Sequence, residues 1–65
     1  MDGAKIGAKL RKLRGEKTAE ELGKELGITQ QAVSNYERGL RIPRDEIKRA
    51  YAQYFGVTVE ELFYT

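Results

Sequence analysis

The 65-residue chain contains no cysteine, histidine or tryptophan, and it has a single serine, Ser34. The absence of cysteine excludes disulfides and thiolate metal sites. Ser34 has neither a histidine nor a cysteine to form the nucleophile-and-base pairs of acyl transfer, and a zinc ion would find only carboxylate ligands. We therefore expect a protein that is not an enzyme and that carries no metal or cofactor.

Long apolar runs are also missing. No apolar segment approaches the roughly 20 residues that cross a bilayer, and residues 1–5 lack the apolar stretch of a signal peptide. A chain of this length has room for one small domain with one core. We expect one domain over residues 1–65 in a cytoplasmic protein, with no membrane contact and no small-molecule ligand.

The net charge of +2 is unevenly distributed along the chain. Residues 1–14 carry five basic residues against one acidic residue, and residues 30–44 carry three against one. The segments 15–29 and 45–65 are each net negative. Two basic segments suit a protein with one face toward a polyanion, although two solvated helix faces are the alternative interpretation.

Apolar periodicity predicts five helices and no strand, with four glycines at the helix ends. The first helix spans residues 4–14 and turns Ile6, Leu10 and Leu13 inward. The fourth begins at Pro43, because proline is favoured in the first helical turn. Its core face comprises Ile47, Ala50, Tyr51, Tyr54 and Phe55. A T-x-x-E cap from Thr58 to Glu61 opens a short fifth helix.

Residues 18–39 predict two short helices joined by a tight turn. Thr18 and Glu21 form a reciprocal capping box at the start of the first of them. Gly27 ends this helix, because glycine takes the left-handed conformation at little cost. Thr29 follows at once as the next N-cap, which forces a sharp change of direction. The spacing therefore predicts a helix-turn-helix built from the second and third helices.

The third helix, predicted over residues 30–38, has two faces. Val33 and Tyr36 point inward, and the opposite face is rich in amides and hydroxyls with little charge. Its members are Gln30, Gln31, Ser34, Asn35 and Arg38. Gln and Asn side chains pair with the N6 and N7 edge of adenine in the major groove, whereas a merely solvated helix more often carries Glu and Lys. This face favours DNA binding, with an ordinary polar surface as the alternative.

The whole pattern resembles the Cro and repressor helix-turn-helix family of phage and bacterial transcription regulators, the lambda-repressor-like or XRE family. The resemblance rests on IGAKLRKLR, TxxELxxxLGITxxxVSxYERG, RxP and GVTVEELF, and it covers nearly the whole chain. It implies a compact all-α, five-helix DNA-binding domain that binds operator DNA as a symmetric dimer. The chain departs from the family at Ala19, where many members have a Gln that contacts a phosphate. The link of residues 15–17 is also short.

The hypothesis assigns base reading to Gln30, Gln31 and Asn35, helped by Ser34, in the major groove. Phosphates are expected to meet backbone N–H groups at Thr18 and Ala19, where the helix dipole favours an anion. Three arginines are expected to add phosphate contacts that position the protein without specifying sequence: Arg38, Arg41 and Arg44. Entry of Arg41 into the minor groove and solvation of the loop arginines are the alternatives.

The resemblance also implies a structural ion pair between Arg14 and Glu37, which would lock the third helix against the first, with direct phosphate contact by Arg14 as the alternative. Gly23 is expected where the second and third helices nearly touch. The C-terminal segment is the candidate dimer interface, because it is more apolar than one short helix needs: Val59, Leu62, Phe63 and Tyr64. In the alternative interpretation, Leu62 and Phe63 close the domain's own core and Tyr64 frays.

The main functional expectation is a sequence-specific regulator, of repressor type, that binds double-stranded operator DNA as a homodimer. A protein-interaction module of the same fold, such as an antitoxin-like or polymerase-binding partner, is the alternative, because fold alone does not decide function.

Overall fold

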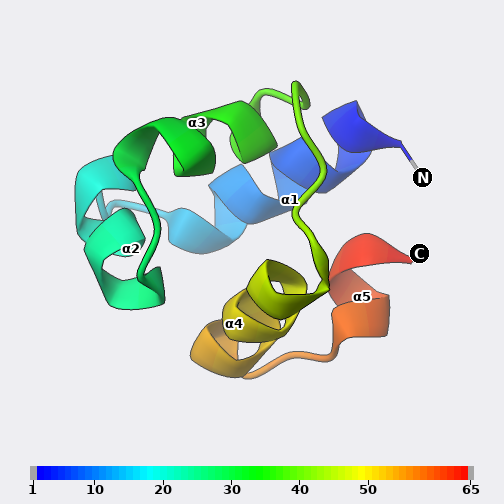
Figure 1. The fold of residues 1–65 in the computed structure, drawn as a ribbon. Coiled ribbons are helices and arrows are strands. Elements are labelled where there is room, and N and C mark those ends of the chain that lie inside the picture. Colours follow the sequence, from blue (N-terminus) through cyan, green and yellow to red (C-terminus); the bar gives the residue numbers. More distant parts are fainter. Residues whose placement is uncertain (1, 65) are drawn as a thin grey trace.

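The computed structural model describes residues 2–64, and over this range the chain forms five α-helices and no strand (Figure 1). The helices are α1 (Gly3–Arg14), α2 (Ala19–Leu26), α3 (Gln30–Glu37), α4 (Asp45–Phe55) and α5 (Val59–Phe63). The predicted all-α, five-helix fold class is confirmed. None of these helices has the length and apolar composition of a bilayer-crossing segment.

Two capping boxes start α2 and α5, as the sequence predicts. In α2 the Glu21 N–H donates to Thr18 Oγ1 at 3.1 Å, and the Thr18 N–H donates to Glu21 Oε1 at 2.8 Å. Thr58 and Glu61 repeat the arrangement at 3.0 and 2.9 Å. The bonds from the backbone N–H groups of the two threonines lower the pKa of both glutamates. Their contribution to stability is therefore present above the ordinary glutamate pKa and declines as the pH falls below it.

The core lies between the α1–α3 layer and the α4–α5 pair (Figure 1). Its central side chain is Tyr51, which is fully buried and has ring contacts to Tyr36, Phe55 and Phe63 at centroid distances of 6.2–6.5 Å. The other buried apolar residues come from all five helices: Ile6, Leu10, Leu22, Val33, Ala52, Leu62 and Phe63. One tyrosine thus joins the helix-turn-helix to the C-terminal helices.

Glycines let α1 approach the end of α3 unusually closely. A Cβ at Gly7 would collide with the carbonyl group of Glu37 and lie 2.8 Å from the Tyr36 carbonyl oxygen. One turn earlier, a Cβ at Gly3 would lie 3.0 Å from the carbonyl oxygen of Gly39. Backbone therefore packs directly on backbone along this contact, and a larger side chain has no space.

Four expectations about helix faces and ends were wrong. Leu13 is 37% exposed, because α1 turns Gly3, Gly7 and Leu10 toward the rest of the fold instead. Tyr54 is 39% exposed, at the surface between α2 and α4. The helix α4 begins at Asp45 and not at Pro43, because Arg44 is extended and its carbonyl accepts the first helical bonds. The predicted third helix ends one residue early, with Arg38 as its C-cap.

Close packing at Gly7 and helix propensity predict opposite changes in stability for Gly7→Ala. Propensity alone says that Gly7→Ala raises the free energy of unfolding by about 0.5–1 kcal/mol. The contact with Glu37 says that it lowers this free energy by about 1–3 kcal/mol, as overpacking does. Urea denaturation measures the difference, with Lys5→Ala on the exposed face of α1 as a control that shifts it by less than about 0.5 kcal/mol. A stabilised Gly7→Ala protein would contradict the close packing.

Candidate nucleic-acid interface

The helix-turn-helix is formed by α2 and α3, joined by residues 27–29. Gly27 has the left-handed conformation with φ of 73°, and the next N–H, from Ile28, donates to the Gly23 carbonyl at 2.9 Å. Thr29 then caps α3 by accepting from the Ala32 N–H at 3.0 Å. A Cβ at Gly23 would lie 2.8 Å from the Ile28 carbonyl oxygen. The close approach expected at Gly23 is confirmed, and it fixes the angle between the two helices.

The outer face of α3 carries the amides. Val33 is fully buried and Tyr36 packs against the core, whereas Gln30 and Gln31 are exposed. Ser34 and Asn35 are half-buried along the same helix. The Gln31 Nε2 group donates to Asn35 Oδ1 at 3.0 Å, a bond that the sequence reasoning missed. The spacing of Gln31 and Asn35 could have predicted this bond, because residues four apart are neighbours on a helix surface.

The loop after α3 presents the arginines. Arg38, Arg41 and Arg44 are all exposed. The Asn35 carbonyl accepts from the N–H groups of Leu40 at 2.9 Å and Arg41 at 3.4 Å, which holds the loop against the end of α3. Arg41 and Arg44 line a surface pocket together with Tyr36. The backbone of the arginine-bearing loop is thus held at Asn35, and the Arg41 and Arg44 side chains lie beside Tyr36.

The start of α2 has one donor already in use. Thr18 is exposed and Ala19 is half-buried, but the Thr18 N–H donates to Glu21 in the capping box. A phosphate at this helix end would have to compete with the Glu21 carboxylate for that donor. The Ala19 N–H and the positive end of the helix dipole remain the more favourable contact for an anion there.

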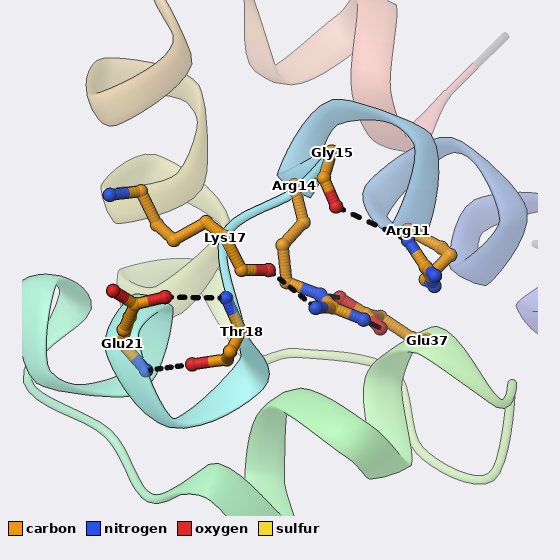
Figure 2. A network of polar contacts seen from close by, with 7 residues as sticks. All are labelled: Arg11, Arg14, Gly15, Lys17, Thr18, Glu21 and Glu37. Atoms are coloured by element: carbon orange, nitrogen blue, oxygen red, sulfur yellow. Dashed lines mark hydrogen bonds and ion pairs between the residues drawn. The ribbon is translucent and has the colours of Figure 1, made fainter.

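An ion pair joins the ends of α1 and α3 (Figure 2). Arg14 Nε donates to Glu37 Oε2 at 2.7 Å and Arg14 Nη2 donates to Glu37 Oε1 at 3.0 Å, with side chains that are 14% and 7% exposed. The remaining guanidinium nitrogen, Nη1, donates to the Lys17 carbonyl in the short link before α2. The hydrogen bonds to Glu37 raise the pKa of Arg14. One guanidinium therefore holds α1, the link and α3 together.

Two polar groups in the interior were missed by the sequence reasoning. The Tyr51 hydroxyl is buried and has no hydrogen-bond partner within residues 2–64. Burial raises the pKa of Tyr51, and the negative charge of Glu37 adds to the shift. Lys48 is only 6% exposed, and its Nζ donates to the Tyr64 hydroxyl at 2.9 Å. Lys48 lies three residues before Tyr51 and four before Ala52, a spacing that could have placed it on the inner face.

The C-terminal residues expected at a dimer interface differ in burial. Leu62 and Phe63 are each 3% exposed, so they close the core of this chain, as the alternative interpretation had it. Val59 is half-buried and Tyr64 is 57% exposed. The Tyr64 side chain lies against Lys48, whose Nζ donates to its hydroxyl and lies 4.8 Å from its ring centroid. Val59 and Tyr64 are therefore the members of this set with substantial surface.

Comparison with known proteins places this arrangement in a family. A helix-turn-helix family model matches residues 8–62, which is most of the chain. The chain belongs to the Cro and repressor type of helix-turn-helix transcriptional regulators. It is 35% identical over 46 residues to an uncharacterized HTH-type transcriptional regulator of Methanocaldococcus jannaschii, covering 71% of this chain and 70% of that protein. No solved structure matches the chain.

In this helix-turn-helix protein, removal of Glu37 should leave the Arg14 charge half-buried without its partner. We expect Glu37→Ala to lower the free energy of unfolding by about 1–3 kcal/mol, the cost of leaving a partly buried hydrogen-bonding group without its partner. The control is Glu46→Ala, which breaks the exposed Arg44–Glu46 pair at 3.9 Å and should change stability by less than about 0.5 kcal/mol. Equal losses in the two variants, measured by thermal or urea denaturation, would show that the Arg14 pair has no special role.

Proposed function

We propose that this helix-turn-helix protein is a sequence-specific repressor that binds double-stranded operator DNA as a homodimer. The observation that carries the proposal is the amide face of α3, with Gln30 and Gln31 exposed and Asn35 half-buried, on a helix held by the Arg14–Glu37 pair and followed by exposed arginines. An α-helix fits the major groove, and its first residues lie deepest there in this class of motif. Gln30, Gln31 and Asn35, with Ser34 beside them, are the proposed base-reading residues.

The phosphate contacts are assigned to the edges of this face. Arg38, Arg41 and Arg44 supply charge from the end of α3 and the loop, and the start of α2 at Thr18 and Ala19 supplies a helix N-terminus. Arg14 and Glu37 are given a structural role, because their side chains are occupied with each other. The protein would then bind the backbone at two places on either side of α3.

The dimer is assigned to the C-terminal segment, where Val59 and the exposed Tyr64 provide the contact surface and the buried Leu62 and Phe63 support it. A two-fold pairing there would separate two α3 helices by about 34 Å, one turn of DNA, and would select a palindromic operator. Such a repressor acts on the chromosome, in the cytoplasm.

Base reading is tested first by finding the operator, through selection of bound sequences from a random DNA pool. Against that operator, we expect Asn35→Ala to lower the discrimination at one base pair in each half-site by about 5- to 150-fold, the range of 1–3 kcal/mol for a good side-chain pair with a base. Gln53→Ala, on the exposed face of α4, is the control and should leave discrimination unchanged. Undiminished specificity in Asn35→Ala would remove Asn35 from the reading set.

Phosphate contacts are tested by the salt dependence of binding. If each protomer neutralises about five phosphates, the dimer should show a slope of about −9 in log K against log salt concentration. Arg41→Ala should make that slope less steep by about two, because it removes one contact from each protomer. Binding that is indifferent to salt would contradict the proposal, and a chain that binds no DNA would favour the protein-interaction alternative.

A further inference from the structure

The two central amides of α3 are bonded to each other in a defined direction. Gln31 and Asn35 lie one helical turn apart on the same face, and Gln31 Nε2 donates to Asn35 Oδ1 at 3.0 Å. The Asn35 backbone carbonyl is also engaged, by the Leu40 and Arg41 N–H groups, so the residue is held at both its main chain and its side chain. The two amides therefore present a paired surface rather than two independent ones.

The direction of this bond changes what each amide offers to DNA. A carboxamide has one oxygen acceptor and two N–H donors. One of the two lone pairs of Asn35 Oδ1 accepts from Gln31, while its two Nδ2 hydrogens make no hydrogen bond within residues 2–64. Gln31 has used one donor and keeps its oxygen and one N–H. The Asn35 end of the pair thus has two free donors and a partly occupied acceptor, and the Gln31 end keeps one acceptor oxygen and one donor.

Base edges in the major groove distinguish these two ends. Guanine presents two acceptors, N7 and O6, whereas adenine presents the N7 acceptor beside the N6 donor. An isolated Asn suits adenine, because it offers one donor and one acceptor. Because Asn35 Oδ1 already accepts a bond from Gln31, it would have to accept a second bond at the same atom to pair with the adenine N6 donor. Guanine asks only for donors, which the Nδ2 group of Asn35 still offers.

We propose that Gln31 sets the base preference of Asn35, so that Asn35 selects guanine instead of adenine in the operator. Gln31 is then a specificity-determining residue that acts through its neighbour as well as through its own base contact. The inference rests on the proposed function, because it requires α3 to lie in the major groove.

The test reverses the bond between the two amides. In Gln31→Glu the carboxylate only accepts hydrogen bonds, so Asn35 must turn Nδ2 toward it and present Oδ1 to the DNA. Gln30→Glu adds the same charge next to it on α3 without touching the Gln31–Asn35 bond. Both variants, the wild-type chain and Asn35→Ala are passed through selection from one random DNA pool. Asn35→Ala identifies the base pair that Asn35 contacts, because enrichment is lost there.

We expect guanine at that base pair for the wild-type chain, and a fall in the guanine-to-adenine ratio of about fivefold or more in Gln31→Glu, the lower end for one side-chain contact with a base. Gln30→Glu should lower overall affinity and alter its own base pair, but keep guanine at the Asn35 position. If Gln31→Glu binds too weakly for selection, Gln31→Ala replaces it and should lower the same ratio, because Asn35 Oδ1 is released.

Adenine at the Asn35 position of the wild-type operator would overturn the inference and leave the proposed function intact. An unchanged guanine preference in Gln31→Glu, or in Gln31→Ala where that variant replaces it, would do the same. A wild-type chain that enriches no sequence from the pool would instead overturn the proposed function, and the inference with it.

Discussion

The Arg14–Glu37 ion pair is the contact on which the position of α3 depends. The two carboxylate oxygens of Glu37 face two nitrogens of one guanidinium, and the third nitrogen holds the Lys17 carbonyl (Figure 2). The pair lies where Gly7 lets α1 touch the backbone of Glu37, so steric fit and charge act on the same residue. Because a stranded partner would be costly, the pair restricts α3 to one orientation on α1.

This fixed orientation explains why the outer face of α3 is free for a ligand. Val33 and Tyr36 are turned into the core toward Tyr51, and the amides are left on the opposite side. Gly23 sets the distance to α2, so the N-terminus of α2 is placed relative to α3. A base-reading helix needs such support, because discrimination between bases depends on side chains held within a fraction of an ångström of their partners.

Much of the architecture could be predicted from the sequence, because its signals are local. Thr18 with Glu21 and Thr58 with Glu61 are capping boxes that each require only four residues, and Gly27 marks a helix end through its own backbone. Leu13 and Tyr54 were predicted in the core but are exposed. The face that a helix turns inward depends on contacts between residues distant in sequence, such as that of Gly7 with Glu37. Proline has a favourable φ for a first helical residue, which suggested a start at Pro43. The extended Arg44 is the N-cap instead, so the helix begins at Asp45.

The candidate site also has features that the sequence predicts and features that only the structure shows. The composition of the α3 face and of the loop with Arg41 and Arg44 can be read from the sequence. The direction of the Gln31–Asn35 bond can be read only from the structure. The burial of Lys48 could not be predicted from its residue type, because lysine is usually exposed. Here Phe63 and Tyr64, which lie far along the chain, pack against it.

We propose the amide face of α3 as the surface that meets DNA. Titration of the isotopically labelled protein with its selected operator, followed by NMR of the side-chain amide groups, tests this claim most directly. We expect the side-chain NH₂ signals of Gln30, Gln31 and Asn35 to shift strongly while that of Gln53, on α4, stays in place. A shift confined to Gln53, with the three α3 amides unmoved, would contradict it.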